Sequence, residues 1–251
     1  MSDLLIGFGE VGQALHQVLG ERREFYIVDP AKGYQPEAGD STEVQWAHVA
    51  IPYTDAFRPV VIEMIRKWKP EVTVLHSTLP VGTTRQLDKD QDYQTRLVYS
   101  PVRGRHPNLA RYLRDFPKWY STDYSGEMDE RVTAYFAAAG IQTRKAPSYE
   151  WLEWAKLVET FTYGYNLVLW QELERQVTKI PGNKHANLTA LKNWLHEKKR
   201  MYDGDLGYVP IYDLVPGPIG GHCVTSNWDL LEPMMDPDLY KFLVKSNEMR
   251  K

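Results

Sequence analysis

The chain has 251 residues, of which 43% are hydrophobic and 25% charged, and its formal net charge is −3 at pH 7. This length suffices for one large domain or two smaller ones, and the lack of a basic excess argues against a nucleic-acid partner. The single cysteine, Cys223, excludes a disulfide within the chain, and no apolar run is long enough to span a bilayer, so we expect a cytoplasmic protein without a membrane partner.

The first half of the chain alternates short apolar runs, typical of strands, with helical patterns. The expected strands are Asp3–Ile6, Phe25–Val28, Ala47–Ile51, Val72–Leu75, Leu97–Tyr99, Lys118–Ser121 and Ile141–Thr143. The expected helices are Val11–Leu19, Phe57–Trp68 and Asp129–Ala139. This alternation predicts a parallel sheet with helices on its faces. The connection after Asp29 is about twenty residues long, which leaves little room for a full helix.

The pattern changes after Pro147. The segment Tyr149–Val177 has helical character without proline, and at about 1.5 Å per residue it would exceed about 40 Å in length. Further helices are expected over Ala186–Lys199 and Pro237–Met249. We therefore predict two domains: an α/β Rossmann-type dinucleotide-binding domain over residues 1–147 and a smaller helical domain with a long central helix over residues 148–251.

A glycine motif follows the first expected strand. Gly7, Gly9 and Gly12 fit the G-x-G-x-x-G pattern, and Asp29 ends the second strand. Gly7 permits a tight turn, Gly9 lets the backbone approach a pyrophosphate, and Gly12 lets the helix pack closely on the strand. Asp29 would accept hydrogen bonds from ribose hydroxyls and repel a 2′-phosphate, which favours NAD over NADP. The alternative is a glycine-rich turn that binds no ligand. The expected cofactor contacts are Gly7, Phe8, Gly9, Glu10, Val11, Gly12, Asp29, Pro52, Ser77 and Thr78.

Three further segments carry a resemblance to a known family. Residues 216–223 read P-G-P-I-G-G-H-C, similar to a P-G-P-G-x-G-G-H-C loop with one residue missing. Residues 76–84 read H-S-T-L-P-V-G-T-T, and residues 155–159 read A-K-L-V-E, with Asn166 and Glu172 continuing that match. In these segments the chain resembles the UDP-glucose/GDP-mannose dehydrogenase family.

The resemblance implies an NAD-dependent enzyme that oxidises a sugar-nucleotide alcohol twice through a cysteine-linked intermediate. It implies Cys223 as the nucleophile, Lys156 as an electrostatic stabiliser of oxyanions and Thr78 as the residue that positions a hydroxyl or water. From spacing alone, a surface lysine is the better interpretation of Lys156, and a single cysteine such as Cys223 is usually a small buried apolar residue. The Gly-Gly-His-Cys context favours an active-site position for Cys223. The expected substrate contacts are Arg103, Arg105, Thr160, Gly220, Gly221 and Asn227. No metal site is expected.

The chain departs from the family pattern at four points. The family's asparagine four residues after the lysine is Thr160, its S-P-E glutamate is Val102, and its aspartate after the cysteine is Asn227. Both carboxylates that could deprotonate water are thus replaced. The chain also stops where the family's C-terminal nucleotide-binding domain would begin, so we expect a shortened form, unless a separate chain supplies that domain.

Two functions follow from these observations. The first is an NAD-dependent oxidoreductase that acts on a sugar nucleotide or a related anionic sugar, including a sugar phosphate. The alternative is a non-catalytic or degenerate NAD-binding paralogue with a regulatory role. We also expect a homodimer, because the long helix carries more aromatic side chains than one small domain can bury. These are Trp151, Trp154, Phe161, Tyr163, Tyr165 and Trp170.

Overall fold

The computed structural model describes residues 2–36, 44–90, 94–124, 126–201, 217–219 and 224–250. Contacts divide the chain into two compact units, Met1–Lys156 and Leu157–Lys251, here called the N-terminal and C-terminal units. The division falls inside the long helix that begins at Tyr149. The domain boundary at Pro147 stays a prediction.

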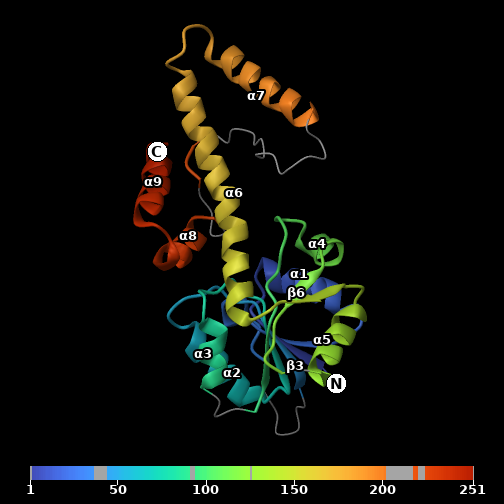
Figure 1. Ribbon diagram of the computed structural model, residues 1–251. Helices are drawn as coiled ribbons and strands as arrows, with labels where there is room; N and C mark the ends of the chain where they lie inside the picture. Colours follow the sequence, from blue (N-terminus) through green and yellow to red (C-terminus); the bar gives the residue numbers. More distant parts are fainter. Residues whose placement is uncertain are drawn as a thin grey trace. The chain divides into compact units, whose positions relative to one another are not determined.

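The N-terminal unit is built on a parallel sheet of five strands in the order β2-β1-β3-β4-β5. Figure 1 shows the sheet between two groups of helices. The strands are β1 Ser2–Ile6, β2 Phe25–Val28, β3 Val44–Val49, β4 Val72–Leu75 and β5 Arg96–Tyr99. The chain adds β2 on one side of β1 and then returns to add β3 on the other side. Strand order therefore reverses at β1, and open parallel sheets bind ligands at the carboxyl ends of such strands.

Helices cover both faces of this sheet. They are α1 Glu10–Leu19, the 3₁₀ helix η1 Pro30–Lys32, α2 Phe57–Trp68, α3 Thr83–Lys89, α4 Leu109–Asp115 and α5 Glu127–Ala137. Apolar side chains of α1, α4 and α5 pack with Leu5, Val74 and Val98 in one core. Those of α2 and α3 pack with Leu4, Ile6 and Leu75 in the other. Successive strand residues thus face opposite helix layers, as the pleat of a strand requires. The expected α/β Rossmann-type fold is confirmed.

The bounds of the elements agree with the sequence-based expectation where the patterns are long. α2, β4 and the helix Tyr149–Val177 match residue for residue. β3 begins at Val44, three residues before the strand expected at Ala47, because the polar Gln45 and His48 interrupt the apolar run. The strand expected over Ile141–Thr143 is β7, Thr143–Lys145, which pairs with β6, Lys118–Tyr120. Ile141 instead ends the preceding turn, where its N–H donates to the Phe136 carbonyl and its side chain is buried.

The C-terminal unit consists of helices in the part of it that the structure describes. They are the remainder of α6 (Tyr149–Val177), α7 Lys184–Met201, α8 Thr225–Leu231, the 3₁₀ helix η2 Glu232–Met234 and α9 Pro237–Glu248. Leu167, Val168, Trp228 and Leu243 form a small core between α6, α8 and α9. Gly164 of α6 makes the contact with α8 possible, since a Cβ there would lie 2.6 Å from Cγ1 of Val224 and 2.7 Å from Cζ2 of Trp228.

Three short helices were not expected from the sequence: α3, α4 and α8 each have seven residues. Two turns are too few for a helical period to stand out from a loop. Across the described ranges of the chain, no helix is long and apolar enough to cross a membrane.

Candidate functional site: the carboxyl edge of the parallel sheet

The glycine motif forms the turn between β1 and α1. Gly7 has a φ of 90° and could not carry a side chain, because a Cβ there would lie 2.6 Å from the Ala50 carbonyl oxygen. A Cβ on Gly12 would lie 2.1 Å from the Gly7 carbonyl oxygen, so α1 approaches the turn as closely as only glycine allows. Both glycines are required by the fold itself.

Gly9 differs from these two glycines. It is the N-cap of α1 with extended backbone, φ −70° and ψ −166°, a conformation open to any residue. A Cβ at Gly9 would meet no atom within 4 Å, and no side chain caps the helix there. The space beside the first N–H groups of α1 is therefore open, and these groups together with the helix dipole favour an anion.

Asp29 lies beside this turn, as the sequence predicts. Its Oδ2 accepts a hydrogen bond from the Phe8 N–H at 2.8 Å, which holds the carboxylate next to the glycine turn. From η1, Lys32 donates its Nζ to the Phe8 carbonyl at 2.6 Å. The half-buried carboxylate of Asp29 can still accept hydrogen bonds from a ligand, because a carboxylate has about four lone-pair positions.

The carboxyl ends of β3 and β4 lie next to each other. The Ser77 hydroxyl, just after β4, donates to the Ile51 carbonyl just after β3, at 2.6 Å. Ser77 is buried by this contact, whereas Thr78 is half-buried and Pro52 is exposed. Ser77 therefore joins the two strand ends.

The second half of the segment 76–84 has a structural partner. The carboxylate of Glu153, fully buried on α6, accepts from the Gly82 N–H at 2.6 Å, the Thr84 N–H at 2.8 Å and the Thr84 hydroxyl at 2.7 Å. Burial raises the pKa of Glu153, and the hydrogen bonds from Thr84 and Gly82 oppose this shift. Gly82, Thr83 and Thr84 thus form the N-terminus of α3, which is bound to α6 through Glu153.

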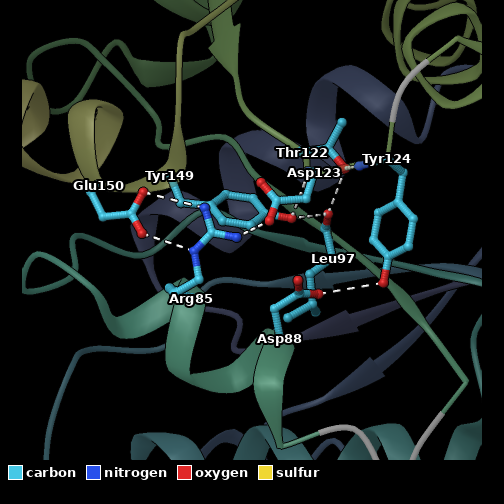
Figure 2. Close-up of polar contacts among 8 residues, drawn as sticks. All are labelled: Arg85, Asp88, Leu97, Thr122, Asp123, Tyr124, Tyr149 and Glu150. Atoms are coloured by element: carbon cyan, nitrogen blue, oxygen red, sulfur yellow. Dashed lines mark hydrogen bonds and ion pairs between the residues drawn. The ribbon is translucent and has the colours of Figure 1, made fainter.

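A second group of polar contacts fixes the first turn of α6 (Figure 2). Arg85 of α3 donates its Nε to Glu150 at 2.9 Å, forms an ion pair with Asp123 and lies over the ring of Tyr149. The Tyr149 hydroxyl donates to the Leu97 carbonyl at 2.9 Å. These contacts anchor the start of α6, and with it Lys156, to the N-terminal unit.

Lys118 of β6 is a buried cation that the sequence motifs did not indicate. Its Nζ donates to the carbonyls of Ser100 at 2.8 Å and Pro101 at 3.3 Å. Burial and, to a smaller extent, the positive charge of Lys156 together lower the pKa of Lys118 to about 7. Lys156 itself is half-buried on α6. Lys118 thus binds the backbone of the Ser100-Pro101 sequence. Val102, at the position where the resembled family has a glutamate, packs in the apolar core.

The basic loop after Pro101 contacts the first residue of α1. His106 pairs through Nδ1 with Glu10, the first residue of α1, at 2.9 Å. The Arg103 guanidinium lies 5.5 Å from the centroid of the Phe116 ring, and Arg105 is exposed. The structure thus brings this loop to the helix whose N-terminus adjoins the glycine turn.

In the C-terminal unit, two of the departures from the family pattern contact each other. Asn227 of α8 donates its Nδ2 to the Thr160 hydroxyl of α6 at 3.0 Å. Within the predicted cysteine loop (residues 216–223), Ile219 exchanges two hydrogen bonds with the side chain of Asn247, at 2.6 and 2.8 Å. The expected site residues Gly220, Gly221 and Cys223 lie outside the described residues.

The lowered pKa of Lys118 makes stability depend on pH. Above about pH 7 the folded state holds Lys118 neutral, while an unfolded chain keeps that proton up to the ordinary value of 10.5. The unfolded state then binds more protons, so the free energy of unfolding should rise with pH in this interval, by at most about 1.4 kcal/mol per pH unit. Urea unfolding of Lys118→Met should lack this rise, whereas Lys89→Met, an exposed control, should keep it. An unchanged slope in Lys118→Met would contradict the assignment.

No protein-family profile matches the sequence, and a search of curated proteins finds no match. Solved structures do match. UDP-D-ManNAc dehydrogenase from Pyrococcus horikoshii aligns with 99% of this chain and 68% of its own, at a TM-score of 0.75 and 14% identity. A UDP-glucose dehydrogenase from Pyrobaculum islandicum aligns with the same shares of both chains, at a TM-score of 0.71 and 13% identity.

A third solved structure matches along its whole length. 3-Hydroxyisobutyrate dehydrogenase from Mycobacterium tuberculosis aligns with 100% of this chain and 100% of its own, at a TM-score of 0.68 and 13% identity. At such low identities, these likenesses establish the fold: a Rossmann-type α/β unit followed by helices.

Proposed function

We propose that this protein is an NAD-dependent oxidoreductase that acts on a sugar nucleotide or a related anionic sugar. The observation that carries the proposal is the open space at Gly9. This glycine is not needed for backbone conformation or for packing, and it stands at the start of α1 beside Asp29. A pyrophosphate next to Gly9 would explain a glycine there.

The residues present fit a dinucleotide. N–H groups at the start of α1 would hold the pyrophosphate, and Asp29 would accept hydrogen bonds from the adenosine ribose. The carboxyl ends of β3 and β4, with Pro52, Ser77 and Thr78, would flank the nicotinamide half. When bound, the cofactor supplies the hydride acceptor. The chain's own contribution is to orient the substrate and stabilise charge on its oxygen.

The proposed roles of the reacting residues rest on the resemblance of three sequence segments. Lys156 would stabilise an alkoxide, Thr78 would position the substrate hydroxyl, and Cys223 would trap an aldehyde as a thiohemiacetal. Thr160, Gly220, Gly221 and Asn227 would contact the substrate, and Arg103 with Arg105 would bind its phosphate. Neither Val102 nor Asn227 can deprotonate water, so hydrolysis of a thioester would be slow.

A second candidate is a dehydrogenase of small hydroxy acids. The observation that favours it is the alignment with 3-hydroxyisobutyrate dehydrogenase, which spans both chains completely. The nucleotide-sugar dehydrogenases extend beyond the match, since this chain covers only 68% of them. A single hydride transfer from an alcohol to NAD⁺ needs no cysteine, so the role of Cys223 separates the two candidates.

Cofactor binding is tested by calorimetric titration of the full chain with NAD⁺ and NADP⁺. We expect NAD⁺ to bind at least about tenfold more tightly, because the Asp29 carboxylate repels a 2′-phosphate. Gly9→Val should fold normally, since the added atoms enter open space, yet lose at least about tenfold in NAD⁺ affinity. Gln17→Val, on the exposed face of α1, is the control. Equal affinity for both cofactors, or full binding by Gly9→Val, would refute the assignment.

The chemistry is tested with sugar-nucleotide and sugar-phosphate alcohols and aldehydes, and with small hydroxy acids. For a sugar aldehyde and NAD⁺, we expect a burst of about one NADH per site and then turnover slowed about 10²–10⁴-fold by the lack of a general base. An acyl adduct on Cys223 should appear by mass spectrometry and be absent in Cys223→Ser. Steady oxidation of a hydroxy acid that survives Cys223→Ser would favour the second candidate. Firm NAD⁺ binding without any NADH would favour a non-catalytic protein.

We also propose that the protein is a homodimer built on α6. Trp151, Trp154, Tyr163 and Tyr165 of this helix are between 37% and 42% exposed, while Trp170 is buried within the chain. A second copy would cover these aromatic side chains. Sedimentation at micromolar concentration should give a dimer, and Trp154→Arg should shift it toward monomer. Trp194→Arg, at an exposed tryptophan of α7, should leave the dimer intact; a monomeric wild type would refute the proposal.

A further inference from the structure

A row of buried polar side chains crosses the face of the sheet that α1 and α5 cover. Asp3 of β1, His48 of β3, and His76 and Ser100, just after β4 and β5, come from four adjacent strands. Each of them is at most 2% exposed. Tyr135 of α5 lies over the row and is also buried. The neighbouring strand positions on this face, such as Leu5, Val74 and Val98, are apolar core, so the row requires an explanation of its own.

The row is one continuous chain of hydrogen bonds. The Tyr135 hydroxyl lies 2.6 Å from Oδ2 of Asp3 and 2.7 Å from Nε2 of His48. Nδ1 of His48 lies 2.9 Å from Nε2 of His76. Nδ1 of His76 lies 2.8 Å from the Ser100 carbonyl oxygen. All of these separations are within the normal range for hydrogen bonds, and each such bond needs a hydrogen between its two heavy atoms.

Counting hydrogens shows that one is missing if Asp3 is ionised. Four hydrogen bonds link Asp3 to the Ser100 carbonyl. Tyr135 and two neutral histidines supply only three hydrogens, and neither an ionised carboxylate nor a carbonyl supplies any. The fourth hydrogen must therefore be bound either at Asp3, as a carboxylic acid, or at the histidine pair, as an imidazolium.

The charges around the row decide between these two positions. Burial lowers the pKa of His48 to about 3, and the positive charges of Lys118 and Arg23 act in the same direction. Burial, Lys118 and His48 likewise lower the pKa of His76, against a smaller effect of the Ser100 carbonyl. At the other end, burial raises the pKa of Asp3, although Tyr135, Arg23 and the Trp46 N–H oppose this. Both histidines are thus disfavoured as cations.

The ion pair with Arg23 is too loose to require an ionised Asp3. The Arg23 Nη1 lies 3.3 and 3.4 Å from the two oxygens of Asp3, longer than the 2.7–2.9 Å typical of charge-assisted contacts. The guanidinium is instead centred 4.2 Å from the ring centroid of Tyr135. A neutral carboxyl group is compatible with this arrangement.

Neutral histidines fix the direction of every bond. His76 must carry its hydrogen on Nδ1, because the Ser100 carbonyl can only accept. Its Nε2 then accepts from Nδ1–H of His48, and Nε2 of His48 accepts from the Tyr135 hydroxyl. The Tyr135 oxygen is left to accept, and its remaining neighbour in the row is Asp3.

We infer that Asp3, Tyr135, His48 and His76 form a buried proton-binding site, in which Asp3 holds the proton and every hydrogen bond points from Asp3 toward the Ser100 carbonyl. Reversal of the three bonds between Asp3 and His76 would move the proton to His76 and leave Asp3 ionised, while the bond from His76 to the Ser100 carbonyl keeps its direction. His76 directly precedes Ser77 and Thr78 at the proposed cofactor edge. The site is independent of the identity of any substrate.

The direct test is nitrogen NMR of the full chain labelled in histidine, at neutral pH. For both buried histidines we expect a protonated Nδ1 and an unprotonated Nε2, the less common tautomer. Nε2–H on His48, or an imidazolium at His76, would overturn the inference, since either requires an ionised Asp3. His185, exposed in the first turn of α7, serves as the reference in the same spectrum.

Variants supply a second readout. Asp3→Asn places an N–H where the protonated carboxyl has its O–H, so both tautomers should be retained and the urea midpoint at neutral pH should be at least as high as that of the wild type. Tyr135→Phe interrupts the row of hydrogen bonds between Asp3 and His48. It should therefore lower the urea midpoint and change the tautomer of His48. Wild-type stability, relative to Asp3→Asn, should fall as pH rises above the unfolded value of 3.8, because the folded state then binds the extra proton. A rise over that interval would show that Asp3 is ionised in the fold.

Discussion

The close approach of α1 to the turn that precedes it is the constraint on which the proposed cofactor edge depends. Gly12 sits so near the Gly7 carbonyl that any Cβ would collide with it, and Gly7 itself lies against Ala50 after β3. These two contacts bring the N-terminus of α1 to the point where strand order reverses. Because Gly9 is under no such constraint, the turn has one glycine that the fold does not need, beside a carboxylate held by the Phe8 N–H.

Buried polar groups fix the rest of this edge. Glu153 receives the start of α3, Arg85 and Tyr149 fix the first turn of α6, and Lys118 holds the Ser100 and Pro101 carbonyls. Glu153, Tyr149 and Lys118 satisfy backbone polar atoms that would otherwise be costly to bury. Arg85 instead pairs with the carboxylates of Glu150 and Asp123. The Ser100 carbonyl connects Lys118 to the hydrogen-bonded row that ends at His76, since it accepts from both side chains. The charge of one cation therefore affects the protonation of its neighbours.

The three residues that differ from the pattern of the resembled family each have packing or hydrogen-bond partners in the fold. Thr160 and Asn227 contact each other through a hydrogen bond, and Val102 packs in the core. Thr160, Val102 and Asn227 thus suit their surroundings, which is compatible with the proposed hydride transfer without efficient hydrolysis. The full-length alignment with 3-hydroxyisobutyrate dehydrogenase is why a reaction without hydrolysis is also considered.

The sequence by itself determined the α/β class, the long helix Tyr149–Val177 and the neighbourhood of Gly7, Gly12 and Asp29, because these depend on local periodicity and on contacts along one β-α-β unit. It could not show that Glu153 docks on Gly82 and Thr84, or that Asp3, Tyr135, His48 and His76 form one row, since the partners in these contacts are 28 to 132 residues apart. Strand order decides which side chains share a face, and only the tertiary structure supplies that order.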